Sequence, residues 1–349
     1  MFKDMEYHDT LRTAAAGLAG HPQDHGWREL YRLFAYGLEG SAAHLDKLLI
    51  ETHAARSTSA THLLTLLGIA LKVQTPAVFE NLVAADDYPS RLRLLERTLE
   101  SHQTEISNIL LTRQNSFSCA RRYLVTPVLL TAYFGPSPDA NINFADLGSG
   151  IGDTAPTAKL RRPVQVLCSR PSMARRHPRI SALRLSSIFA VDRGPMPDLS
   201  WVRACYGQSE YYSRLYFELL ETLSHPDVQT SPATFRELDL LDFKHLADFI
   251  NENEINVANM SYVLYELDPG ARRRVIETIV HELHPPGVLL VTEPANELHR
   301  QGCVVDLFDN RSLEPMSLCY VSDGHFIGYV LPLDDYDAFT HTRPVSYES

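Results

Sequence analysis

The 349 residues, 44% of them hydrophobic and 21% charged, can form one large domain with an accessory domain, which excludes extensive disorder. The formal net charge of −11 argues against a general nucleic-acid-binding protein, because phosphate contacts need clustered Lys and Arg residues. Residues 1–6 lack the apolar core of a signal peptide, and no run approaches the roughly 18 apolar residues of a membrane span. We therefore expect a protein without a nucleic-acid or membrane partner.

The cysteines are scattered and contain no C-x-x-C pair: Cys119, Cys168, Cys205, Cys303 and Cys319. This spacing predicts neither a disulfide framework nor a zinc cluster, and we expect no metal site. Reduced thiols favour a cytoplasmic location.

Apolar residues recur at three- and four-residue spacing over residues 27–134, as at Leu63, Leu64, Leu67 and Leu71. This periodicity is typical of amphipathic helices. Residues 135–139 contain Gly and Pro and read as a linker. We therefore predict a helical domain over residues 1–135 and a second domain over residues 136–349.

A polar segment near the end of this helical region carries Arg113, Gln114 and Asn115. It precedes an apolar helical segment over residues 123–134, which leads into the second domain. A short return path would bring the three polar side chains above the first loop of that domain, where we expect them to bind a substrate. The alternative is a capped turn with solvated Arg113 and Asn115.

An apolar strand-like run, then an acid, then glycines spaced G-x-G-x-G occupy residues 144–153. A buried strand that turns abruptly into a helix needs residues without Cβ where the backbone takes positive φ and where a ligand approaches. The stretch therefore predicts a cofactor loop, with contacts from Asp146, Gly148, Ser149, Gly150 and Gly152. A dinucleotide loop would carry its third glycine one residue later, which disfavours an NAD-dependent oxidoreductase.

Two later strand-like runs also end in acids. Residues 185–191 lead to Asp192, and residues 234–238 lead to Asp239 and Leu240. Asp242 competes with Asp239, or caps the helix that follows. Asp192 lies about 40 residues after the glycines instead of the usual 20 or so, from which we infer an inserted strand pair over residues 163–186.

The remaining pattern predicts a fourth strand with its exit over residues 255–267 and a fifth strand over residues 288–294, joined by a helix. Asn259 and Met260, on the fourth strand, are further candidates for cofactor binding. An antiparallel hairpin with strands at residues 317–321 and 325–331 would close the sheet.

Candidate catalytic side chains follow the fourth and fifth strands, because ligands bind outside the carboxyl ends of parallel strands. These candidates are Tyr262, Tyr265, Glu293 and His299.

Two of these features together resemble class I S-adenosylmethionine (SAM) methyltransferases: the acid before the G-x-G-x-G loop, and the Pro-Gly turn, apolar strand and Glu-Pro ending of residues 283–294. The resemblance implies an α/β fold with a Rossmann-like, mostly parallel seven-stranded sheet. It also implies that the loop amides face the methionine part of SAM, with Asp146 beside its ammonium group. Asp192 would accept the ribose hydroxyls, and Asp239 and Leu240 would lie at the adenine.

Residues 113–115 before an Arg-Tyr-Leu-x-x-Pro helix, the glycine loop, residues 191–195 and Trp201 together resemble the largely actinobacterial domain-of-unknown-function family 2332. Members of that family resemble class I methyltransferases with a helical N-terminal cap, and the similarity spans most of the chain. The chain has a shorter polar motif than the family's Thr-Arg-x-x-Gln-Thr-Asn. It also has a G-x-G-x-G loop where the family usually has Ser-Ala-Gly, which brings it closer to a functional SAM loop.

We therefore predict a SAM-dependent methyltransferase for a small molecule, by O- or N-methylation, in specialised metabolism such as natural product biosynthesis. Holding donor and acceptor in line can supply much of the catalysis, and a base is needed only if the acceptor must lose a proton. The alternative is a SAM-binding protein without transfer activity that acts as a partner or regulator. The helical domain is expected to form a lid over the acceptor; another use for it is a homodimer interface.

Overall fold

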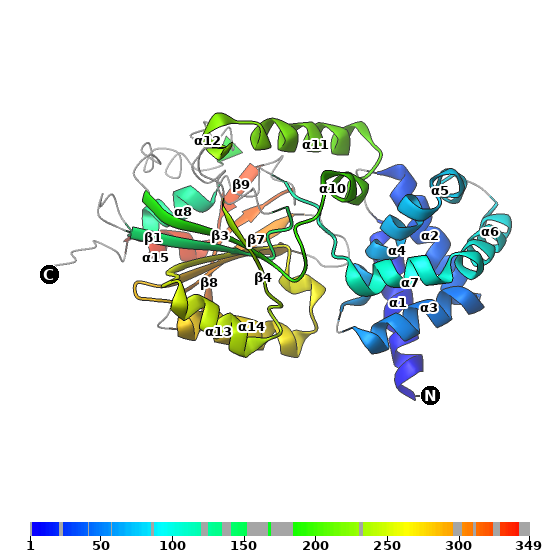
Figure 1. Ribbon diagram of the computed structural model, residues 1–349, viewed down its shortest axis with the longest axis horizontal. Helices are drawn as coiled ribbons and strands as arrows, with labels where there is room; N and C mark the ends of the chain where they lie inside the picture. The colour runs from blue at the N-terminus through cyan, green and yellow to red at the C-terminus, as the bar shows by residue number, and fades with distance from the viewer. Residues whose placement is uncertain are drawn as a thin grey trace, which may run out of the picture.

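The computed structural model places a bundle of helices beside a sheet that is covered by helices on both faces (Figure 1). The structure describes residues 2–20, 24–40, 42–56, 58–84, 87–119, 125–134, 141–151, 167–168, 184–229, 233–295, 302–309, 312–323 and 329–341.

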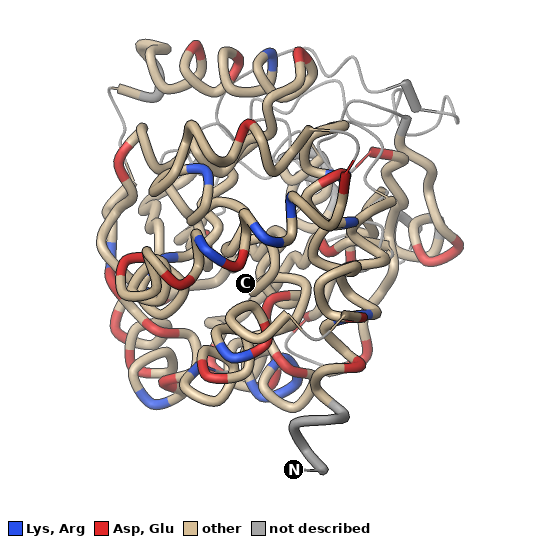
Figure 2. The backbone as a smooth tube through the Cα atoms, turned by 90° about the vertical axis from the view of Figure 1, so that its right-hand side faces the viewer, with Lys and Arg blue, Asp and Glu red and all other residues tan. Residues whose placement is uncertain are grey.

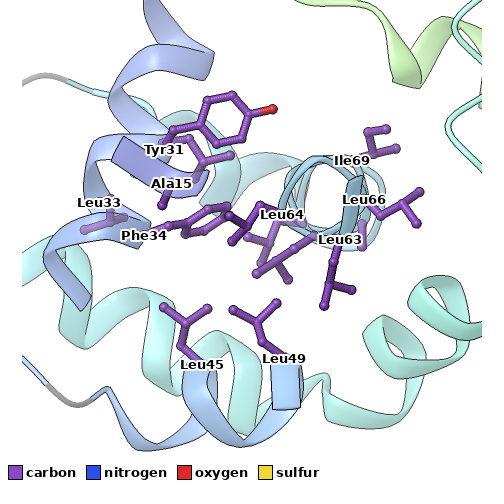
Figure 3. Packing of buried hydrophobic residues seen from close by; sticks show 14 of the residues in the cluster. Ala15, Tyr31, Leu33, Phe34, Leu45, Leu49, Leu63, Leu64, Leu66 and Ile69 are labelled. Atoms are coloured by element: carbon purple, nitrogen blue, oxygen red, sulfur yellow. The ribbon is translucent and has the colours of Figure 1, made fainter. Parts of the chain in front are cut away.

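The bundle is built from the N-terminal helices, namely α1 (Phe2–Leu18), α2 (His25–Glu39), α3 (Ala43–Ala55), α4 (Ala60–Gln74), α5 (Pro76–Leu82), α6 (Tyr88–Ser101) and α7 (Gln103–Thr112). Apolar residues surround α4 on all sides, and Leu63, Leu64, Leu66 and Ile69 are fully buried. A helix that is apolar all round belongs in the middle of a bundle. In Figure 3, Leu64 points toward Phe34 of α2, whereas Leu66 and Ile69 lie on the opposite side of α4. The apolar spacing predicted helices over residues 27–134, and α2 to α7 occupy residues 25–112 of the chain.

The sheet contains nine strands in the described residues, in the order β2-β9-β8-β7-β6-β5-β1-β3-β4. Their bounds are β1 (Asn141–Leu147), β2 (Leu167–Cys168), β3 (Arg184–Asp192), β4 (Thr234–Glu237), β5 (Val257–Ser261), β6 (Val288–Pro294), β7 (Cys303–Asp309), β8 (Ser312–Val321) and β9 (Tyr329–Pro332). Strands β4, β3, β1, β5 and β6 pair in parallel. The pairs β6–β7, β7–β8 and β8–β9 are antiparallel, whereas β2 pairs in parallel with β9.

The expected seven-stranded sheet is therefore wrong: the sheet is mixed and larger. The main omission is β7, which pairs along its length with β6 on one side and with β8 on the other. Burial alternates from Cys303 to Leu307, with Asp306 at a half-buried position, so the run lacks the continuous apolar character of the inner strands. The expected C-terminal hairpin exists as β8–β9, but β8 begins at Ser312, earlier than predicted, because it also pairs with β7.

Side chains alternate between two cores on opposite faces of the sheet, because successive residues of a strand point to opposite sides. On one face, Phe144 packs with residues of α8 (Thr126–Phe134) and α15 (Asp334–His341). On the other face, Ala145 packs with residues of α13 (Phe243–Glu252) and α14 (Pro269–Glu282). Helix α8 thus packs with the sheet, although it precedes the expected domain boundary at residue 135.

The connection between β3 and β4 contains α10 (Leu199–Cys205), α11 (Glu210–Leu223) and α12 (Pro226–Gln229). Trp201 and Cys205 of α10 belong to the core of the helical bundle, so this connection joins the bundle to the sheet. Most of the expected inserted strand pair lies outside the described residues. The part that is described, β2, lies at the sheet edge opposite β4.

Basic and acidic residues alternate over the helical face shown in Figure 2, so neither sign forms a broad patch there. Cys119, Cys205, Cys303 and Cys319 are buried in the described part of the fold. None of the helices in the described ranges combines the length and the apolar character needed to cross a membrane. The same residues contain no group of three or more His, Cys, Asp or Glu side chains that could hold a metal ion.

Candidate functional site

The candidate site lies at the carboxyl end of β1, at the point where the order of the strands in the sheet reverses. Strand β1 pairs with β3 on one side and with β5 on the other. The loops that leave neighbouring strands of a parallel sheet diverge at such a switch point and leave a crevice for a ligand. The glycine-rich stretch follows β1, so the topology places it at this crevice.

The glycine loop takes a backbone conformation that other residues rarely adopt. Gly148 has φ of 76° and Gly150 has φ of 62°. A Cβ on Gly148 would lie 2.3 Å from Cγ2 of Val263, and a Cβ on Gly150 would lie 3.1 Å from Oγ of Ser118. These two glycines are therefore required by both conformation and space. Gly152 lies outside the described residues.

The backbone amides of this loop are bonded to β3. The carbonyl of Val191 accepts hydrogen bonds from the amides of Gly148 and Ser149, at 2.8 and 3.0 Å. Oγ of Ser149 is buried and has no partner among the described residues. The loop therefore offers a ligand the unpaired Ser149 hydroxyl, while these two amides fix the loop to the sheet.

Asp192 ends β3 and faces the same loop. Its Oδ2 accepts from the amide of Gly150 at 2.8 Å, and its Oδ1 accepts from the amide of Arg193 at 2.7 Å. Burial raises the pKa of Asp192 to about 6, although these two amide bonds act in the opposite direction. An ionised carboxylate has about four lone-pair sites, so two remain for a ligand.

Asp239 and Leu240 lie just beyond β4. One carboxylate oxygen of Asp239 contacts Nε of Arg193 at 3.0 Å, and the other accepts from the amide of Leu241 at 3.0 Å. Asp242 caps α13 by accepting from the amide of His245 at 3.2 Å. Of the two acids, Asp239 lines the pocket, whereas Asp242 caps the helix.

An extended segment, residues 113–119, crosses from the helical bundle to the glycine loop. The indole Nε1 of Trp201 donates to the carbonyl of Gln114 at 3.0 Å, and the hydroxyl of Tyr206 donates to the carbonyl of Ser118. The contact between Ser118 and Gly150 shows that the segment lies directly against the loop. We call residues 113–119 the strap.

Arg56 fixes the start of the strap. Its guanidinium group donates to the carbonyls of Leu110 and Arg113, at 2.6 and 2.8 Å, and to the side-chain amide of Gln114. Arg113 itself is exposed, and its guanidinium lies 5.2 Å from the ring of Trp201. Of the three residues expected to bind a substrate, Gln114 and Asn115 line the pocket, whereas Arg113 lies outside its lining.

The glycine loop, the strap and the strand ends enclose a pocket of about 950 Å³, counting the space at its open mouth. It is lined by Arg56, Thr58, Gln114, Asn115, Ser116, Phe117, Ser118, Cys119, Gly148, Ser149, Gly150, Asp192, Arg193, Asp239, Leu240, Leu241, Ser261, Tyr262, Val263, Glu266 and Leu267. Both structural units contribute to this lining. A concave site lined by apolar side chains and a few convergent polar groups is typical of small-ligand binding.

The segment after β5 supplies the opposite wall of the pocket. Tyr262 has φ of 60°, which is strained for a residue with a large side chain. Such strain is concentrated at functional sites, where the surrounding structure can maintain it. The hydroxyl of Ser261 is buried and has no partner among the described residues, as at Ser149. Two unpaired hydroxyls therefore border one pocket.

Two further catalytic candidates, Glu293 and Tyr265, make hydrogen bonds within the protein. Glu293 accepts from the amides of Val263 and Leu264 with one oxygen and from that of Tyr265 with the other, at 2.8–3.0 Å. Burial raises its pKa to about 7 despite these bonds. Tyr265 is buried and donates to Glu266 at 3.2 Å. Neither Glu293 nor Tyr265 lines the pocket, and His299 lies outside the described residues.

Asp146, Asn259 and Met260 are buried inside the sheet instead of lining the pocket. Asp146 and Asn259 are opposite each other on β1 and β5, and Nδ2 of Asn259 donates to Oδ1 of Asp146 at 2.9 Å. This pair satisfies two polar groups in a dry environment. In this geometry the pair links the two central strands beneath the loop.

Sequence reasoning missed Arg56, Thr58, Ser261 and Glu266. In the sequence, Arg56 and Thr58 lie between α3 and α4, many residues away from any strand. No local pattern indicated that they would line a binding site. Ser261 and Glu266 adjoin the predicted Tyr262 and Tyr265, so the rule of strand ends could have included them.

No protein-family model and no curated protein matches the chain. The resemblance to the domain-of-unknown-function family 2332 therefore stays a prediction. Among solved structures, a selenomethionine-substituted CurJ carbon methyltransferase is similar with a TM-score of 0.30 and 13% identity, over 84% of this chain and 74% of that chain. This likeness is too remote to assign an activity.

Proposed function

We propose that the protein is a SAM-dependent methyltransferase that acts on a small molecule. The observation that carries the proposal is the bond from the amide of Gly150 to Asp192. It joins an acid at the end of β3 to a positive-φ glycine loop after β1, at the switch point of a parallel sheet. A cleft in this position suits a nucleoside-containing ligand, with the carboxylate as a two-point acceptor for ribose hydroxyls.

The lining fits the separate parts of SAM. The two free lone-pair sites of Asp192 suit the ribose, and Asp239 with Leu240 suits the adenine. The unpaired hydroxyls of Ser149 and Ser261 suit polar groups of the ligand, because buried hydroxyls gain most from a new partner. Three carboxylates face two guanidinium groups in the lining, and this excess of negative charge suits a cation.

SAM supplies an activated methyl group on a positively charged sulfur. The residues of this chain would position that group and exclude water, since orientation can supply most of the required rate enhancement. Tyr262 is the catalytic candidate that lines the pocket. Its hydroxyl donates to the carbonyl of Gly302 at 3.4 Å, and its oxygen would orient the acceptor by accepting a hydrogen bond. Glu293 and Tyr265 would act indirectly, by holding the segment that carries Tyr262.

The helical bundle supports a small acceptor in preference to an exposed macromolecule. Arg56 and Thr58 reach the pocket from the bundle, and the strap lies against the glycine loop. An enclosed site strengthens the polar contacts that orient an acceptor. We propose that the bundle forms a lid, that Gln114 and Asn115 contact the acceptor, and that the acceptor is an alcohol or amine of specialised metabolism.

The proposal is tested first by calorimetry with SAM and S-adenosylhomocysteine (SAH), and with NAD as a comparison. We expect both sulfur ligands to bind and NAD not to bind. Asp192→Asn should weaken both by about 1.5–3 kcal/mol, because it removes a charged acceptor. Asp248→Asn, an exposed acid on α13 paired with Lys244, is the matched control and should change nothing. Failure of SAM and SAH to bind would contradict the proposal.

Binding without transfer is the second candidate, favoured by the structural roles of Glu293 and Tyr265. The two are separated by incubating the protein with SAM that carries a ¹³C-methyl group and a library of small phenols, carboxylic acids and amines. A methylated product with an equal amount of SAH supports the enzyme. Tight SAM binding with no product from any acceptor class supports a binding protein.

A further inference from the structure

Glu266 carries a carboxylate oxygen that no described residue satisfies. The residue ends the short 3₁₀ helix η4 (Leu264–Glu266) and lines the pocket. Its Oε1 lies 2.9 Å from Nδ1 of His62 and accepts from the hydroxyl of Tyr265 at 3.2 Å. No hydrogen bond from the described residues reaches Oε2, and the side chain remains 17% exposed. The second oxygen is therefore available to a ligand.

The backbone of Glu266 is held firmly between the two structural units. Its carbonyl accepts from the amide of Ser59 at 2.9 Å and from the hydroxyl of Thr58 at 3.4 Å. Its amide donates to the carbonyl of Val263 at 3.1 Å. His62, which contacts Oε1, is fully buried on α4. With both its backbone and Oε1 fixed, the carboxylate keeps its place at the pocket wall.

The two guanidinium groups that line the pocket form their hydrogen bonds and ion pair with residues other than Glu266. Arg193 contacts Asp239 through Nε at 3.0 Å. Arg56 donates to the backbone carbonyls of Leu110 and Arg113. Neither guanidinium group forms an ion pair with Glu266 in the described structure. Arg56 nevertheless lies close enough to Glu266 for their charges to attract each other. The lining still carries three carboxylates against two guanidinium groups, an excess of negative charge that a cationic ligand would offset.

We propose that Glu266 makes the pocket selective for a ligand with a positive charge at the sulfur position, so that SAM binds more tightly than SAH. This inference rests on the proposed SAM site. In methyl transfer the S–CH₃ bond breaks and its electron pair stays on sulfur, while the acceptor atom forms a bond to the methyl carbon and releases its proton to solvent water. The sulfonium becomes a neutral thioether. Glu266 therefore favours the substrate over the product, which promotes product release.

The test compares the dissociation constants of SAM and SAH by calorimetry in the wild type and in Glu266→Gln. Gln preserves the size and one oxygen but removes the charge. We expect the wild type to bind SAM about tenfold more tightly than SAH, as expected for one close charge in a partly solvated site. Glu266→Gln should bind SAM about tenfold less tightly than the wild type does, and its affinity for SAH should fall by less than about twofold. Retained SAH binding also shows that the variant is folded.

Glu277→Gln is the matched control, because Glu277 is an acid on α14 that pairs with Arg273. It should leave both dissociation constants unchanged. A second measurement needs no variant: sinefungin, which has an amine-bearing carbon in place of the sulfonium, should bind the wild type more tightly than SAH. Raising the salt concentration should reduce the preference for SAM over SAH and the preference for sinefungin over SAH. The reason is that ions screen the attraction between Glu266 and the positive charge of the ligand.

Equal affinity of the wild type for SAM, sinefungin and SAH would overturn the inference. So would an equal loss of SAM and SAH binding in Glu266→Gln, or an unchanged ratio of the two dissociation constants, which is expected if neighbouring groups already offset the charge of the carboxylate. All these outcomes leave the proposed SAM site intact. Failure of the wild type to bind any of the three ligands would instead overturn the proposed function, and this inference with it.

Discussion

The carboxylate of Asp192 accepts a hydrogen bond of 2.8 Å from the amide of Gly150, a residue 42 positions earlier in the chain. Two neighbouring parallel strands, β1 and β3, bring the two residues together. One side chain therefore fixes the glycine loop and offers its remaining lone pairs to the pocket. The shape of the loop and the proposed contact to the ribose of SAM therefore involve the same carboxylate.

Ligand affinity should depend on the ionisation of Asp192. Burial raises the pKa of this carboxyl to about 6. If the ionised form accepts the ribose hydroxyls, the affinity for SAH should fall as the pH drops below this value, by about tenfold at pH 5. Calorimetry from pH 5 to 8 measures this. In Asp192→Asn the pH dependence should disappear; parallel curves for the two proteins would assign it to another group.

The same pKa shift predicts the opposite trend for stability without ligand. Because the pKa is higher in the folded than in the unfolded chain, the contribution of Asp192 to stability is complete below about pH 4 and is lost as the pH rises through about 6. The wild type should therefore lose up to about 3 kcal/mol relative to Asp192→Asn between pH 4 and 7. Urea unfolding at several pH values measures the difference, and a pH-independent difference would contradict the assignment.

Glu293→Ala should destabilise the fold. The carboxylate accepts three backbone amides from the segment after β5, and these donors would lose their partner in a buried place. We expect the free energy of unfolding to fall by about 3 kcal/mol, measured by urea denaturation. Glu277→Ala, on the outer side of α14, is the control and should have no measurable effect. Near-normal stability with lost activity would instead favour a catalytic role for Glu293.

Ser261→Ala should have opposite effects on stability and on binding. The hydroxyl is buried without a partner, so its removal should raise the free energy of unfolding of the free protein by about 1 kcal/mol. If SAM bonds to this hydroxyl, the variant should bind SAM less tightly by about the same amount. Thermal denaturation and calorimetry measure the two effects. An exposed serine at the end of α11, Ser224, provides the control Ser224→Ala; weaker folding of Ser261→Ala would show an internal partner.

Arg56→Ala should impair ligand binding far more than Arg113→Ala. Arg56 bonds to the carbonyls at the start of the strap, whereas Arg113 is exposed against Trp201. We expect loss of Arg56 to cost about 2–4 kcal/mol in stability, because its buried acceptors are left unpaired, and to weaken SAH binding. Arg113→Ala should stay close to the wild type in both measurements. The reverse order would return the substrate role to Arg113.

Much of the fold follows from local pattern. The spacing of leucines gave the helical bundle, and the apolar runs before Asp146, Asp192 and Glu293 gave three inner strands. These signals depend on neighbours within a few residues, which every sequence displays directly. Strand β7 was not predicted, because a half-buried strand that contains acids has a weaker pattern of apolar residues than a fully buried strand.

The sequence alone determined that glycines follow the first inner strand and that acids end the next two, so the position of the pocket could be predicted. Only the tertiary structure decided which polar atoms remain free to bind. Glu293 and Asp146 have the same residue types as catalytic or binding acids, yet amides from residues 263–265 and the side chain of Asn259 occupy them. Glu266 became a candidate because His62, 204 positions away, and Tyr265 occupy one oxygen and leave the other open. Whether a side chain is free to bind a ligand depends on its hydrogen-bond and ion-pair partners, and those partners come from distant parts of the chain.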